Sequence, residues 1–210
     1  MKTRVKICGI TRVDDALTAA AQGVDAIGLV FYAKSPRFVS VGQAAEICAA
    51  LPAFVTTVAL FKDAGADVVT QTIKTTGIDL LQFHGSEPAD FCQQFERPYI
   101  KAVGMEGVDD VHAFAQQYSR SHGLLLDSHA PGAAGGTGKT FDWHDIPDDL
   151  AQPVILAGGL TVANVAQAIA IAKPWAVDIS SGVESEPGIK DAEKIRLFMQ
   201  QVSAADHQAR

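Results

Sequence analysis

The sequence predicts an α/β protein built as a single-domain (β/α)8 barrel, the TIM-barrel architecture. Two observations predict it: eight short apolar runs recur along the chain, and segments with helical spacing separate them. Such alternation requires a parallel sheet with helical crossovers. Eight units in 210 residues reach the lower size limit of a closed barrel. We assign residues 1–203 to the catalytic barrel and expect residues 204–210, which lack an apolar face, to form a disordered tail.

The eight predicted strands are rich in β-branched and aromatic residues, which favour a pleated, buried sheet. They span residues 4–8, 25–31, 54–61, 79–83, 98–103, 122–126, 153–156 and 175–179. Each run is short enough to be a strand and too short for a buried helix.

The predicted helices span residues 13–22, 41–51, 64–76, 87–95, 108–118, 162–172 and 191–202, with a further short helix in 143–150. Gly23 and Gly77 are suitable residues to end helices, and Ser86 is a suitable N-cap with Pro88 in the first turn. An open, doubly wound sheet is the alternative, but its first turn would carry a GxGxxG motif. This chain has Cys8-Gly9-Ile10-Thr11 there, so the closed barrel is favoured.

Composition limits the classes of function. The formal net charge is −7, which argues against the basic surface that nucleic-acid binding requires. No apolar run has the roughly 20 residues of a membrane helix, and the N-terminus does not read as a signal peptide. Three cysteines without zinc-ligand spacing give no reason to expect a metal. We expect a reduced, cytoplasmic protein that binds neither nucleic acid nor membrane.

Catalytic residues of a barrel lie where the strands end and the next loops begin. Two such loops are rich in small residues that can offer backbone N–H groups to a phosphate. They contain Gly158 and Gly159 after the seventh strand, and Ser180, Ser181 and Gly182 after the eighth. The alternative is that these glycines only form tight turns. Because the two loops are neighbours in a barrel, we predict a phosphate site between them.

Cys8 and Asp127 end the first and sixth strands. A free cysteine is usually a small buried hydrophobic residue, but the position of Cys8 at a strand end makes a reactive role as good an interpretation as a structural one. A carboxylate that follows three leucines is costly to bury without a partner or a function. The two strands are three steps apart around a closed barrel, so these side chains would face each other. Such a pair suits proton removal on one side of a substrate and proton delivery on the other.

Two further strand-end residues are candidates for substrate binding. Arg37 is either a solvated loop charge or a planar donor for a substrate carboxylate. His84 is either a structural hydrogen-bonding residue or part of the pocket lining. The stretch 135–140 looks like the end of a Walker A motif, but the required first glycine is Ala133. A glycine-rich loop over 128–140 that closes over the substrate is the better interpretation.

Taken in order, the strand-end motifs resemble those of the phosphoribosylanthranilate isomerase family, over about residues 3–200. The motifs are KICGIT at 6–11, SPR at 35–37, QFHG at 82–85, LLD at 125–127, GTGKTFDW at 136–143, LAGGL at 156–160 and DISSGVE at 178–184. Phe83 and Ser128 stand where the family often has leucine and threonine, and neither is a proposed catalytic position.

The resemblance implies an Amadori rearrangement of N-(5-phosphoribosyl)anthranilate in tryptophan biosynthesis, with no cofactor or metal. It implies that Cys8 is the general base at the ribose C2 and Asp127 the general acid at the ring oxygen. Arg37 would hold the anthranilate carboxylate, and Gly158, Gly159, Ser181 and Gly182 the phosphate. Free thiols are mostly protonated and free carboxyls mostly ionised at neutral pH, so both groups need a tuned environment. The partner would be this small phosphorylated molecule, and the chain a monomer or homodimer.

Three rivals stand beside this interpretation. The aldose-ketose isomerase of histidine synthesis would be expected to have an aspartate at the end of the first strand, where this chain has Cys8. Indole-glycerol-phosphate synthase would need a lysine-centred site and a longer N-terminus. A phosphate-binding barrel without catalysis would have no need of both Cys8 and Asp127.

Overall fold

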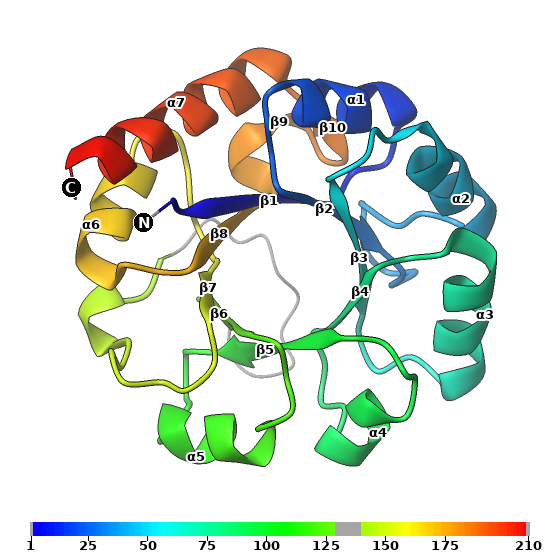
Figure 1. The fold of residues 1–210 in the computed structure, drawn as a ribbon, viewed down its shortest axis with the longest axis horizontal. Coiled ribbons are helices and arrows are strands. Elements are labelled where there is room, and N and C mark those ends of the chain that lie inside the picture. The colour runs from blue at the N-terminus through cyan, green and yellow to red at the C-terminus, as the bar shows by residue number, and fades with distance from the viewer. Residues whose placement is uncertain (1, 129–139, 209–210) are drawn as a thin grey trace.

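The protein, described here from a computed structural model, is a closed barrel of eight parallel strands surrounded by helices (Figure 1). The structure describes residues 2–128 and 140–208. The strand order runs from β1 to β8, and β8 pairs with β1 to close the sheet. The strands are β1 Arg4–Cys8, β2 Ala26–Val30, β3 Thr56–Phe61, β4 Leu80–Phe83, β5 Tyr99–Gly104, β6 Leu124–Asp127, β7 Val154–Leu156 and β8 Ala176–Ile179. Each overlaps a predicted run, so the predicted barrel is confirmed.

Helices follow the strands and cover the outside of the barrel (Figure 1). They are α1 Val13–Ala21, α2 Val41–Ala50, α3 Ala66–Thr76, α4 Ala89–Gln93, α5 Val111–Gln117, α6 Val165–Ala172 and α7 Ala192–Gln208. The residues predicted as a short helix at 143–150 form only a 3-10 turn, η1 Trp143–Asp145. No helix within 2–128 and 140–208 is long and apolar enough to cross a membrane.

Several predicted helix starts are too early. Pro88, and not Ser86, is the N-cap of α4, whose first residue is Ala89. Helix α5 starts at Val111 because the Asp110 side chain accepts a hydrogen bond from the N–H of Ala113, a standard N-cap. Neither a suitable capping residue nor apolar spacing therefore marks the first turn of these helices by itself.

The predicted disordered tail at 204–210 is wrong for residues 204–208, which continue α7. Ala205 and Asp206 are buried. The backbone N–H and hydroxyl of Thr3 donate to the Asp206 carboxylate at 2.8 and 2.6 Å. The segment is therefore held by a polar contact with the opposite end of the chain, which no apolar pattern can reveal. Residues 209–210 lie outside the described chain, as do 129–139 of the predicted closing loop.

The main apolar core lies between the strands and the helices, where Ile7 packs with residues of α1 and α7 such as Ala16 and Phe198. Side chains alternate along a strand. Lys6 and Cys8, on either side of Ile7, therefore face the interior of the barrel.

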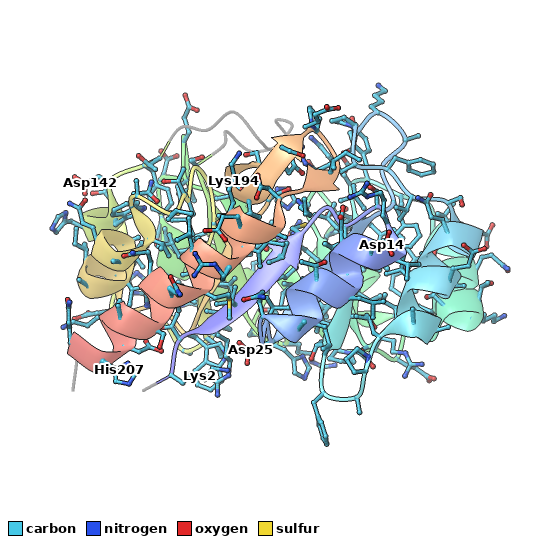
Figure 2. All side chains as sticks on the ribbon, turned by 90° about the horizontal axis from the view of Figure 1, so that it is seen from above. Lys2, Asp14, Asp25, Asp142, Lys194 and His207 are labelled. Carbon is cyan, nitrogen blue, oxygen red and sulfur yellow. The ribbon has the colours of Figure 1, made fainter. Side chains whose placement is uncertain are left out.

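A short hairpin follows β8 and was not predicted. The turn η2 Ser181–Val183 leads into β9 Glu184–Glu186, which pairs antiparallel with β10 Ile189–Lys190. Seen from the side, the hairpin lies at one end of the barrel, and Lys2 and Asp25 lie at the other (Figure 2). The hairpin is thus at the end where the strands finish.

Candidate active site

A cavity of about 170 Å³ opens at the carboxyl ends of the strands. Eight of the nine predicted site residues line it: Cys8, Arg37, His84, Asp127, Gly158, Gly159, Ser180 and Ser181. Residues that are far apart in sequence meet here because the parallel strands all end at this rim. Side chains at the ends of the first and sixth strands therefore line one cavity.

Gly182 is the exception, because it is not among the residues that line this cavity. A Cβ at Gly182 would collide with the carbonyl oxygen of Leu160 and approach Ile179. The glycine thus allows the loop after β8 to pack against the loop after β7, beside the site.

Cys8 lies at the end of β1, with a side chain that is almost wholly buried. One layer deeper, Lys6 and Asp178 are direct neighbours on β1 and β8, and their charged atoms are 2.9 Å apart. Burial raises the pKa of the Cys8 thiol above its ordinary value, while the ammonium groups of Lys6 and Lys190 act in the opposite direction. The thiol is therefore a strong base once ionised, and cations stabilise that form.

Asp127 ends β6 and is also buried, with a relative exposure of 7%. His84 Nε2 is 3.7 Å from an Asp127 carboxylate oxygen. On its other side, the His84 ring nitrogen Nδ1 is 3.0 Å from the Gln82 side-chain amide. The structure thus supports the interpretation of His84 as pocket lining and places it beside Asp127.

Arg37 is not a solvated loop charge, because its side chain is only 13% exposed. Its Nε and one Nη donate to the two carboxylate oxygens of Glu184 at 2.8 and 2.7 Å. Burial alone would raise the pKa of Glu184, but hydrogen bonds from Arg37 and Lys190 lower it below its ordinary value. Glu184 is therefore ionised and holds Arg37 at the cavity wall.

The loop after β7 has the conformation that only glycine adopts easily. Gly158 and Gly159 have φ angles of 82° and 64°, and a Cβ at Gly158 would lie 2.4 Å from the backbone nitrogen of Ser128. The following helix α6 begins only at Val165. Because the helix dipole acts mainly within the first turn, loop N–H groups are the nearer donors for an anion.

The cavity is also lined by residues to which the sequence analysis gave no role, although several belong to the strand-end motifs: Val30, Tyr32, Lys34, Ser35, Pro36, Leu60, Lys62, Gln82, Ala157, Leu160, Asp178 and Ile179. Lys62 directly follows β3, so its position at a strand end was a usable signal. Tyr32 lies close to it, with the Lys62 ammonium 5.4 Å from the ring centre. The cavity therefore combines cations with an apolar wall, which suits an anionic molecule with an aromatic part.

Comparison with known proteins gives one consistent result. The family model described as N-(5'phosphoribosyl)anthranilate (PRA) isomerase matches residues 5–201. The N-(5'-phosphoribosyl)anthranilate isomerase of Pseudomonas savastanoi pv. phaseolicola is 57% identical over 199 residues, which cover 95% of this chain and 97% of that protein.

Solved structures agree. A phosphoribosyl anthranilate isomerase in complex with reduced 1-(o-carboxyphenylamino)-1-deoxyribulose 5-phosphate is 36% identical, with a TM-score of 0.86. The match covers 96% of this chain and 99% of that one. A structure of monomers made from the dimeric enzyme of Thermotoga maritima is 34% identical, with a TM-score of 0.83, over 96% of this chain and 98% of that one.

Proposed function

The chain belongs to the N-(5'-phosphoribosyl)anthranilate isomerase family and catalyses its step of tryptophan biosynthesis, and we propose that Cys8 and Asp127 are the base and acid of the reaction. The step is the Amadori rearrangement of N-(5-phosphoribosyl)anthranilate to 1-(2-carboxyphenylamino)-1-deoxyribulose 5-phosphate. One observation carries the proposal: the two side chains line one cavity from strands on different sides of the barrel.

Formation of the enolamine needs one proton delivered and one removed. Asp127, protonated, gives its proton to the furanose ring oxygen, so that the C1–O bond breaks and an iminium ion forms at C1. The Cys8 thiolate then takes the C2 proton, and the electrons of that C–H bond form the enolamine. Proton return to C1 and loss of the enol proton give the ketone. Atoms and electrons balance, so the reaction is an isomerisation that general acid and base groups can catalyse.

The two ends of the substrate have matching positions on the cavity wall. The backbone N–H groups of Gly158 and Gly159, with Ser180 and Ser181, are proposed to bind the phosphate. Arg37 is proposed to bind the ring carboxylate, because a guanidinium has five N–H donors and Glu184 occupies only one edge of it.

Growth of a strain that lacks this tryptophan step tests the proposal. The wild-type gene should restore growth without tryptophan, and genes carrying Cys8→Ala or Asp127→Asn should not. Restored growth with either variant at matched protein levels would reject the assigned pair.

Replacing Arg37 with alanine is expected to raise KM about 10- to 100-fold with a smaller effect on kcat. The reason is that charge-assisted hydrogen bonds contribute roughly 1.5–3 kcal/mol, and the carboxylate is remote from the reacting carbons. Steady-state kinetics, followed by the fluorescence change of the anthranilate group, would measure both constants. Arg12→Ala is the matched control, since Arg12 forms an ion pair with Asp15 and does not line the cavity. An unchanged KM in Arg37→Ala would show that the carboxylate binds elsewhere.

We propose further that the chain forms a homodimer through Phe54. A dimer is named for the Thermotoga maritima enzyme. Phe54 is fully exposed, with a φ of 73° that side chains rarely adopt, in the loop between α2 and β3. Strained backbone that presents an aromatic ring to solvent is consistent with a contact that covers the ring.

Phe54→Glu is therefore expected to shift the molar mass measured by light scattering from dimer to monomer. Its kcat should stay close to wild type, because Phe54 precedes β3 and so lies at the opposite end of the barrel from the site. Val68→Glu, at another exposed apolar residue, is the control and should remain dimeric. A wild-type monomer, or a dimeric Phe54→Glu, would contradict the proposal.

We also propose that the enzyme acts in the cytoplasm. Its three cysteines are free thiols in the structure, and the proposed base must stay reduced. Thiols persist in that compartment.

A further inference from the structure

A row of three charged side chains borders the cavity next to Cys8. Arg37 pairs with Glu184, and Glu184 pairs with Lys190 at 2.8 Å. The Lys190 and Glu184 side chains are 1% and 5% exposed. Buried charges are stable only when they are paired and hydrogen-bonded, so these three side chains depend on one another for their positions.

The β9–β10 hairpin brings Glu184 and Lys190 together, because they are directly opposed across its two strands. Lys190 Nζ also donates to the carbonyl oxygens of Cys8 at 2.7 Å and Ser180 at 3.2 Å. Three acceptors close to one nitrogen use all three protons of an ammonium group. One buried cation therefore connects the strand end of the proposed base, the proposed phosphate loop and the partner of Arg37.

Arg37 reaches this row by crossing over Gly9. Gly9 has a φ of 75°, and a Cβ there would lie 2.4 Å from Arg37 Cδ. Two contacts thus fix the conformation of the Arg37 side chain: its methylene groups lie against Gly9, and its guanidinium is held by the Glu184 carboxylate. The row contains two cations and one anion, so it keeps a net positive charge beside the cavity.

We propose that Glu184 and Lys190 are positioning residues that orient Arg37 for a substrate carboxylate, an inference that rests on the proposed role of Arg37. Glu184 takes the Nε edge of the guanidinium, which leaves the remaining Nη donors for a second carboxylate. Lys190 fixes Glu184 and offsets its charge, so that Arg37 attracts the ligand as a cation.

Binding of two inhibitors separates this role from a general effect on the fold. One is the reduced carboxyphenylamino-deoxyribulose phosphate, and the other is the same compound without the ring carboxyl group. The measured quantity is the ratio of their dissociation constants. Glu184→Gln keeps the shape of the side chain, and we expect it to reduce the preference for the carboxylated compound about tenfold, since an orienting contact is lost. Binding of the compound without the carboxyl group should be unchanged.

Two further variants complete the test. Lys194→Met is the control, because Lys194 Nζ contacts the backbone oxygen of Glu184 at 2.7 Å and should leave the ratio unchanged. Lys190→Met should reduce both the ratio and kcat, because it also frees the Cys8 carbonyl, and Lys190→Arg should restore part of each.

The outcomes are distinct. If Arg37→Ala leaves the preference intact, the proposed carboxylate role of Arg37 is itself wrong. If Arg37→Ala abolishes the preference but Glu184→Gln keeps it, only the positioning inference is overturned. Equal weakening of both inhibitors by Glu184→Gln would also overturn it, because that pattern reflects a structural role alone.

Discussion

Cys8→Ala is expected to lower kcat about 10³- to 10⁴-fold and to leave substrate affinity nearly unchanged. The magnitude is that of a general base which acts in the rate-determining proton transfer. Affinity should persist because the residues proposed to hold the phosphate and the carboxylate lie elsewhere on the cavity wall. Steady-state turnover gives kcat, and binding of the reduced product analogue gives affinity. Near-normal turnover would remove Cys8 as the base.

Cys48→Ala is the matched control for this prediction, since Cys48 is a half-buried thiol on α2 outside the cavity.

Alkylation by iodoacetamide tests the protonation state of the Cys8 thiol in the same preparation. Because burial raises the pKa of Cys8, the thiolate is the minor form at neutral pH. The alkylation rate of Cys8 should therefore rise as the pH is raised through the alkaline range. A rate that does not change with pH above neutrality would show that Lys6 and Lys190 lower the pKa of Cys8 more than burial raises it.

Much of the barrel was predictable because its strands are buried on both faces and appear as apolar runs. The site was predictable for a related reason: parallel strands end at one rim, so Cys8, Arg37 and Asp127 had to be near each other. This argument needs only the order of strands in the barrel. It does not depend on the first residue of each helix, where the predictions were poorest.

Contacts between distant residues were not predictable. Arg37 and Glu184 are 147 positions apart, and the hairpin that carries Glu184 has strands too short to give a pattern. The Lys6–Asp178 pair was missed because continuous buried runs do not show which residues face the barrel interior. The last turns of α7 were not predicted for a similar reason, because they are held by hydrogen bonds between Thr3 and Asp206, which are far apart in the sequence. The role of a buried charged residue can be assigned only when its partner is known.

Asp127→Asn is expected to lower kcat about 10²- to 10⁴-fold, the range for loss of a general acid. An amide of nearly the same shape keeps the position beside His84, but its N–H protons are not acidic enough to be transferred to the ring oxygen. Ring opening should then limit the rate. Turnover of substrate deuterated at C2 measures this, since the isotope effect in Asp127→Asn should fall close to one, because C–H cleavage follows the slow step.

The isotope effect distinguishes the role of Asp127 from that of Cys8, whose loss slows C–H cleavage itself. Asp90→Asn, at an exposed carboxylate on α4, is the control and should behave as wild type. A slow Asp127→Asn enzyme that retains a full primary isotope effect would place Asp127 in the C2 deprotonation step. In that case the acid for ring opening would have to come from another group at the cavity, and His84, 3.7 Å from the carboxylate, would be the first to replace.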